Sequence, residues 1–198
     1  MIPIQFITYT TDKFSHEDTA KIALDGGCKW VEIHATSQEE IGRIIEACHK
    51  HEATCILYDN VDLCKSLKAD GVRLASGRTD IMEARETLGH EFIIGATAAC
   101  FDHIKKYKRN GADYICCGTY SPTPIAHTDT IDLSYYASLM REVYTQKLRI
   151  PVCAYGHITT ADIMPLIDNG VQGICIGQPS FDNNLSSEAI SLMLNADQ

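Results

Sequence analysis

The sequence has no long uninterrupted run of apolar residues, and a membrane-spanning helix needs roughly 18 of them. It also has no surplus of positive charge: 17 Lys and Arg stand against 26 Asp and Glu, which gives a formal net charge of −9. Because a phosphate backbone is held by excess Lys and Arg, we expect no nucleic-acid partner. No cationic patch precedes an apolar run in residues 1–5, so we expect no secretory signal.

Disulfides and zinc ligands are also not predicted. The nine cysteines are an odd number and include no Cys-x-x-Cys pair. Free cysteine packs like a small hydrophobe inside apolar runs, and five of the nine lie in such runs: Cys55, Cys116, Cys117, Cys153 and Cys175. The His and Cys positions show no spacing typical of zinc sites. We therefore expect free thiols and a cytoplasmic protein.

A single globular domain over residues 1–198 fits what the sequence does contain. Hydrophobic residues make up 45% and charged residues 22%, close to the globular average. One sequence pattern recurs four times: a helix-like stretch, then one or two Gly, then a short apolar run. The Gly positions are Gly26–Gly27, Gly71, Gly111 and Gly170. This pattern predicts a helix that ends on a left-handed Gly and turns directly into a buried strand.

Eight short apolar runs predict eight parallel strands, each buried on both faces. They cover residues 4–9, 30–33, 54–58, 72–74, 92–96, 114–117, 152–154 and 173–176. Helical patterns lie between them, including Ser37 to Glu40 as a capping box. About 25 residues per unit suit a compact (β/α)8 TIM barrel of the α/β class. An open doubly wound sheet is the alternative, but its Gly-x-Gly-x-x-Gly fingerprint is missing.

The carboxyl ends of barrel strands are where an active site is expected. Asp59 and Asp80 follow neighbouring strands, where two carboxylates could share a Mg²⁺ ion, and helix capping is the alternative for both. Gly156 and Gly177 follow the last two strands, where backbone N–H groups can approach a phosphate. A longer irregular stretch, residues 119–133, follows the sixth strand, and such a loop is usually functional.

The chain resembles the family of thiamine phosphate synthase and its relative, the thiazole tautomerase. The resemblance covers nearly the whole chain and is closest in residues 55–63, 68–74, 111–118, 121–123 and 150–159. It implies an enzyme that joins hydroxymethylpyrimidine pyrophosphate to a thiazole phosphate and releases pyrophosphate. The partners it implies are small phosphorylated substrates and a Mg²⁺ cofactor, and a homo-oligomer stays open.

Individual roles follow from the resemblance, position by position. Asp59 and Asp80 match Mg²⁺ ligands, Thr97 stands in the place of a Ser near the pyrophosphate, and Thr123 matches a retained Thr. Gly156 matches part of the thiazole-phosphate cradle.

The chain departs from the family pattern at several phosphate-binding positions. His34 and Thr36 stand where the family has Arg and Lys, Tyr58 replaces an Asn, and Ala126 replaces a Lys beside His127. His157 replaces a Gly, and Gln178 replaces a Ser. The tautomerase's catalytic His is not recovered, because Ala99 stands in its place.

Other side chains could supply the phosphate contacts that the missing Arg and Lys would make. These are Arg78, which is close to Asp80 in the sequence, and His34, His127 and His157. An exposed loop charge is the alternative interpretation of Arg78. The expected site therefore comprises His34, Arg78 and Thr97 as catalytic residues. Tyr58, Thr123, Gly156, His157, Gly177 and Gln178 are expected to bind substrate. A repurposed or non-catalytic phosphate-binding barrel, or a tautomerase-like isomerase, is the alternative function.

Overall fold

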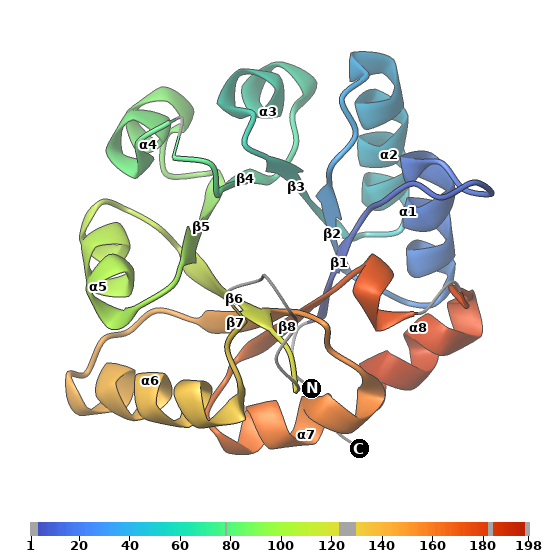
Figure 1. Cartoon of the computed structure of the whole chain (residues 1–198). Helices are drawn as coiled ribbons and strands as arrows, with labels where there is room; N and C mark the ends of the chain where they lie inside the picture. The colour runs from blue at the N-terminus through green and yellow to red at the C-terminus, as the bar shows by residue number, and fades with distance from the viewer. Residues whose placement is uncertain (1–3, 78, 123–129, 182–183, 197–198) are drawn as a thin grey trace.

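The computed structural model describes residues 4–77, 79–122, 130–181 and 184–196. Within them, eight strands alternate with eight α-helices, and the strands close into a parallel barrel ringed by the helices (Figure 1). The strands are β1 (Ile4–Ile7), β2 (Trp30–Ile33), β3 (Thr54–Tyr58), β4 (Gly71–Leu74), β5 (Ile93–Ala98), β6 (Tyr114–Tyr120), β7 (Val152–Gly156) and β8 (Gly173–Ile176). The helices are α1 (His16–Asp25), α2 (Gln38–Lys50), α3 (Val61–Leu67), α4 (Ile81–Leu88), α5 (Phe101–Arg109), α6 (Leu133–Thr145), α7 (Thr160–Asp168) and α8 (Ser187–Leu194). The predicted (β/α)8 barrel is confirmed.

Two apolar layers hold the barrel together. The larger lies between the strands and the surrounding helices, where alternate strand residues such as Val31, Val72 and Ile115 are fully buried. A smaller cluster of Tyr114, Cys116 and Cys175 fills the barrel interior. Because successive strand residues point to opposite faces, the same strands also direct polar residues toward the barrel axis.

Helix starts follow the predicted capping chemistry with one difference. Ser15 forms a capping box with Asp18 at α1, and Ser37 caps α2. The predicted capping box at α2 is incomplete, because the Glu40 side chain accepts the backbone N–H of Glu17 in α1 at 3.2 Å instead of returning to the N-cap residue. The residues that α2 buries are spaced along one face of the helix: Ile41, Ile44, Ile45 and Cys48.

A recurrent hydrogen bond fastens the amino-terminal end of the barrel. The residue just before or at the start of one strand accepts from a backbone N–H at the start of a neighbouring strand. The side-chain oxygen of Asp70 accepts the backbone N–H of Cys55 at 2.8 Å, and that of Asp113 accepts the N–H of Ile94 at 2.8 Å. The side-chain oxygen of Gln172 accepts the N–H of Val152 at 2.9 Å. These side chains follow the repeated helix-to-strand turns and hold adjacent strands in register.

The predicted left-handed Gly is found in three of the four repeats and is wrong in one. Gly27, Gly111 and Gly170 have positive φ, but after α3 the left-handed residue is Lys68. Gly71 instead lies in β4, where an added Cβ would meet the carbonyl oxygen of Ile93 at 2.2 Å. Close strand packing, not turn geometry, explains that glycine.

Further differences concern the strand ends, and β5 and β7 each end two residues after the predicted position. β1 ends at Ile7, two residues before the predicted end, and β6 continues to Tyr120, into the stretch expected to be irregular. Pro165 lies inside α7 without ending it. The nine cysteines are free, and none of the helices in the described ranges is long and apolar enough to cross a membrane.

Candidate active site

A buried ion pair crosses the barrel interior beneath the carboxyl ends of β2 and β4. Arg73 donates to both carboxylate oxygens of Glu32, from Nε at 2.6 Å and from Nη2 at 2.5 Å. Gln5 adds a hydrogen bond to the same carboxylate at 2.7 Å, and His34 approaches it at 2.5 Å. Gln5, Glu32 and Arg73 are buried and His34 is partly exposed, so the four side chains form one polar network that begins in the barrel interior.

The remaining contacts of Arg73 point toward the mouth of the barrel. Its Nη1 donates to the hydroxyl of Thr97 at 2.6 Å. The guanidinium carbon also lies 5.0 Å from the ring centroid of Tyr58 and 5.6 Å from that of Tyr155. Cation–π contacts of this kind are favourable when the cation is desolvated. Arg73 therefore links the buried acid to three side chains at or near the mouth.

The charges in this network are mutually dependent. Burial disfavours ionisation of Glu32, but the charge of Arg73 and the hydrogen bonds from His34 and Arg73 outweigh it and lower the pKa of Glu32 to about 2. Burial likewise disfavours the Arg73 cation, and the Glu32 carboxylate more than offsets this, which raises the pKa of Arg73. Both groups are therefore charged over the whole physiological range.

An aromatic platform lies above the network. The rings of His34 and Tyr58 have centroids 4.2 Å apart with an interplanar angle of 31°. Both rings line a cavity of about 360 Å³, together with Asp59 and Asn60. Thr8 at the end of β1 fixes the backbone of His34 by accepting its N–H at 2.9 Å. The structure thus brings three of the predicted residues, His34, Tyr58 and Asp59, into one cavity.

Asp59 orders the loop that follows β4. Its two carboxylate oxygens accept the backbone N–H groups of Ala75 and Ser76, at 2.8 and 2.9 Å. Asp59 itself has a left-handed backbone with φ of 49°, a conformation that Asp tolerates better than most residues. It does not cap α3, because Asn60 holds that position.

Asp80 lies at the other end of the same loop. It is the N-cap of α4, and its side chain accepts from the backbone N–H of Met82 at 2.8 Å, so the capping alternative is observed for this residue. Asp80 and Thr97 line a second cavity of about 190 Å³, to which α5 contributes Lys106. The two aspartates therefore bracket one short loop while lining adjacent cavities.

Gly156 is required by its backbone environment. It has φ of 139°, and an added Cβ would lie 2.4 Å from the carbonyl oxygen of Tyr120. The N–H of the next residue, His157, donates to that same carbonyl at 2.8 Å. In this structure the close approach at Gly156 is thus to β6, and that N–H of His157 is engaged within the protein.

Gly177 has no such steric requirement. It is buried and extended, and an added Cβ would make only ordinary contacts at 3.5 Å with Ile7. Gln178 is exposed and begins a single 3-10 turn, η1 (Gln178–Ser180), so the segment directly after β8 is not an α-helix. Arg78 and Thr123 lie outside the described residues, as do Ala126 and His127.

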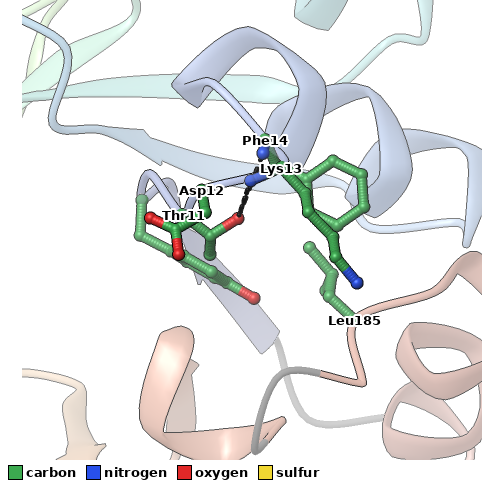
Figure 2. Close-up of a pocket in the computed structure, with 6 residues that line it drawn as sticks. Thr11, Asp12, Lys13, Phe14 and Leu185 are labelled. Atoms are coloured by element: carbon green, nitrogen blue, oxygen red, sulfur yellow. Dashed lines mark hydrogen bonds between the residues drawn. The ribbon is translucent and has the colours of Figure 1, made fainter.

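A further cavity of about 290 Å³ lies beside the loop after β1. Figure 2 shows residues of its lining, in which Lys13 and Phe14 of the loop lie beside Leu185 and Thr11 turns toward the loop backbone. Thr11 Oγ1 accepts the N–H groups of Lys13 and Phe14, at 3.1 and 3.0 Å, which gives this loop a defined turn. Lys13 is a cation at the same end of the barrel, and the sequence pattern did not single it out.

Comparison with known proteins decides the family. The family described as thiamine monophosphate synthase matches residues 4–179. The thiamine-phosphate synthase of Phocaeicola vulgatus is 36% identical over 183 residues, covering 88% of both chains. That of Bacteroides fragilis (strain YCH46) is 38% identical over 184 residues, covering 89% of this chain and 90% of the other. This chain belongs to the thiamine monophosphate synthase family.

Solved structures support the same architecture. The thiamine phosphate pyrophosphorylase from Pyrococcus furiosus superimposes with a TM-score of 0.82, covering 98% of this chain and 95% of the other, at 22% identity. A 3-hexulose-6-phosphate synthase gives a TM-score of 0.74 at 15% identity, covering 99% of both chains. At these identities the likeness concerns the barrel fold alone.

For a thiamine monophosphate synthase, the main feature that the sequence pattern missed is Arg73. A usable signal existed, because Arg73 lies between Val72 and Leu74 and therefore points away from the helix-facing apolar layer. Glu32 occupies the same kind of position in β2. Two opposite charges facing the axis from nearby strands predict a buried pair, since an unpaired buried charge is costly.

Proposed function

We propose that the protein joins hydroxymethylpyrimidine pyrophosphate to a thiazole phosphate, forming thiamine phosphate and releasing pyrophosphate. The observation that carries this proposal is the 36–38% identity to thiamine-phosphate synthases over nearly nine-tenths of each chain. The polar residues assembled at the carboxyl ends of the strands support it. We also place the activity in the cytoplasm, in keeping with the nine free thiols.

The chemistry requires stabilisation of charge more than transfer of protons. The bond between the pyrimidine methylene carbon and the pyrophosphate oxygen breaks, and the thiazole nitrogen forms the new bond to that carbon. Positive charge develops on the pyrimidine while pyrophosphate leaves with its electron pair. Preorganised dipoles and charges at the site lower such a barrier.

Asp59 and Asp80 would hold the Mg²⁺ ion. Their donor set fits, because hard carboxylate oxygens are the ligands that Mg²⁺ prefers, and both side chains border the loop between β4 and α4. Magnesium bound there would neutralise negative charge on the departing pyrophosphate. The backbone N–H groups that Asp59 accepts keep its carboxylate oriented before any ligand arrives.

The remaining site residues would bind the two substrates. The rings of His34 and Tyr58, which pack at a tilt, offer aromatic surface for a heterocycle. Thr97 and Arg78 would donate to the pyrophosphate. Thr123, Gly156, His157, Gly177 and Gln178 would surround the thiazole phosphate.

Arg73 would act as a positioning residue for Thr97. Glu32 binds the Nε and Nη2 of Arg73, and this directs Nη1 at the Thr97 hydroxyl. Because the Thr97 oxygen accepts the hydrogen bond from Nη1, the Thr97 O–H would be available to donate to a substrate oxygen. Because the Glu32 carboxylate neutralises the guanidinium charge, Arg73 would contribute this fixed hydrogen bond and would not replace the net positive charge of the Arg and Lys whose places His34 and Thr36 take.

Turnover with both substrates tests the proposal. Purified protein with Mg²⁺ should produce thiamine phosphate and an equal amount of pyrophosphate, measured by chromatography. We expect D59N and D80N each to lower kcat/KM about a hundredfold or more, since each removes a group that stabilises the leaving charge. D62N, which changes an exposed aspartate in the first turn of α3, should leave it unchanged.

Ligand-dependent melting distinguishes the enzyme from a barrel that only binds phosphate. A ligand that binds the native state alone raises the melting temperature. We expect a rise with Mg²⁺ plus pyrophosphate and another with the thiazole phosphate. A response to the thiazole phosphate only, together with no product in the turnover assay, would contradict the proposed synthase.

A further inference from the structure

Three side chains of different chemistry converge at the amino-terminal end of β3. They are His49 from the last turn of α2, Cys55 from β3 and Asp70 from the turn before β4. The Sγ of Cys55 lies 3.5 Å from the Nε2 of His49 and 3.1 Å from the Oδ2 of Asp70, and the last two atoms are 3.4 Å apart. No other group of three such side chains comes this close within the described part of the chain.

These distances match one face of a tetrahedral metal site. Zinc bonds of about 2.0–2.3 Å to sulfur, nitrogen and oxygen place tetrahedral ligand atoms about 3.3–3.6 Å apart. Two of the three observed separations fall in that interval. The third, 3.1 Å between Cys55 Sγ and Asp70 Oδ2, is a hydrogen-bond distance and would lengthen by about 0.2–0.5 Å when both atoms bind one ion. The three atoms therefore need to move very little to share one ion.

The fold contains an internal comparison for this site. Asp113 performs the same backbone task as Asp70, accepting a strand N–H at 2.8 Å, and the second partner of its carboxylate is Arg85 at 2.6 Å. Holding strands in register thus requires neither a thiol nor an imidazole. Among the described residues, the Asp70 carboxylate has no arginine partner of this kind; the thiol of Cys55 and the imidazole of His49, both metal-binding groups, lie next to it instead.

We propose that His49, Cys55 and Asp70 bind a divalent transition-metal ion of the Zn²⁺ class. One thiolate, one imidazole and one carboxylate are ligands that suit zinc, whereas Mg²⁺ prefers oxygen alone. On binding, the S–H bond of Cys55 breaks, sulfur keeps the electron pair for the metal, and the proton passes to solvent. The two anionic ligands then balance the charge of the ion.

The site is accessible and separate from the mouth of the barrel. The side chains of His49 and Asp70 are 45% and 39% exposed, while Cys55 is buried below them. Cys55 lies at the opposite end of β3 from Tyr58 and Asp59, so a bound ion would not contact the substrates. It would instead join α2, β3 and the start of β4, and solvent would complete its coordination.

Competition with a chromophoric zinc chelator tests this site in the full chain. We expect one equivalent of Zn²⁺ to bind, with excess Mg²⁺ failing to displace it, and the melting temperature to rise. C55S and H49Q should each weaken binding at least about tenfold. H51Q and D113N are the matched controls, the first at the C-cap of the same helix and the second at the analogous strand start, and both should bind as the wild type does.

Cobalt substitution supplies a spectroscopic check. A tetrahedral site with one cysteine gives Co²⁺ a thiolate charge-transfer band, which should be present in the wild type and lost in C55S. Should C55S fail to fold, H49Q still decides the matter, because His49 is at the surface. Absence of a one-equivalent site, or binding that H49Q leaves unchanged, would overturn the proposal without affecting the proposed synthase activity.

Discussion

Arg73 and Glu32 are the residues whose interactions most constrain the mouth of this barrel. Both are buried, and each satisfies the other through two charge-assisted hydrogen bonds. A buried ion pair contributes little compared with an apolar pair of similar volume, but removal of one partner leaves the other charge unpaired. This asymmetry gives a measurable signature.

R73M should lower the free energy of unfolding by about 3–5 kcal/mol, because Glu32 would then remain buried without its counter-charge. The double variant E32M/R73M should lose clearly less than the single variant, since no unpaired charge remains. Urea denaturation of the four proteins of the cycle, including E32M, measures the coupling. Additive losses would show that the two side chains do not act as a pair.

The acid dependence of stability should report on Glu32. Its pKa is about 4.3 in an unfolded chain and about 2 in the folded one, so its stabilising effect is complete above pH 4.3 and declines as the pH falls toward 2. This contribution is on the order of 3 kcal/mol. E32Q cannot titrate, so the stability gap between wild type and E32Q should narrow below pH 4.3. A gap that stays constant from pH 7 to pH 2 would contradict the depressed pKa.

Residue-level prediction from sequence succeeded where a role depends on local geometry. Ser37 and Asp80 cap helices, as their positions in the sequence indicated. The role of Arg73 depends on β2 and β5 lying on either side of β3 and β4, and the three-residue cluster at Cys55 depends on a turn 15 positions away. Spacing along the chain carries little information about such contacts.

At the scale of elements, the junction of β6 and β7 is the most sterically constrained part of the mouth. Gly156 pairs with Tyr120, and both the amide nitrogen and the carbonyl oxygen of Tyr120 lie within 2.5 Å of the place a Cβ would occupy. The positive φ of Gly156 adds a backbone penalty for any other residue.

G156A should therefore destabilise the protein by roughly 2 kcal/mol or more, through both the clash and the strained backbone. G177A is the matched control after the neighbouring strand, and we expect its effect to be within about 0.5–1 kcal/mol of zero, because its surroundings accept a methyl group. Thermal and urea unfolding compare the two variants. Equal effects would mean that the approach of Gly156 to β6 is not a constraint.

The strands were predictable because each is a short apolar run buried on both faces. The geometry of the loops was less predictable from the sequence. β6 extends into the stretch expected to be irregular, and Tyr120 pairs there with Ile131 through an isolated bridge. The backbone of Ala75 and Ser76, which follow β4, is held by the side chain of Asp59, which follows β3. Local residue preferences do not encode such a long-range contact.

For the molecule as a whole, barrel closure places the two proposed sites at opposite ends of the strands. Pairing of β1 with β8 places the carboxyl ends of all strands around one mouth and their amino ends around the opposite face. The proposed Mg²⁺ and phosphate ligands lie at the first, and the proposed zinc ligands at the second. The two sites should respond independently to their own ligands.

A crystal structure of the protein with Mg²⁺ and pyrophosphate tests the central assignment most directly. Carboxylate oxygens of both Asp59 and Asp80 are expected at about 2.0–2.1 Å from the ion, with pyrophosphate on the ion and near the Thr97 hydroxyl. An ion bound away from these two side chains, or pyrophosphate outside the mouth formed by the carboxyl ends of the strands, would contradict the assignment.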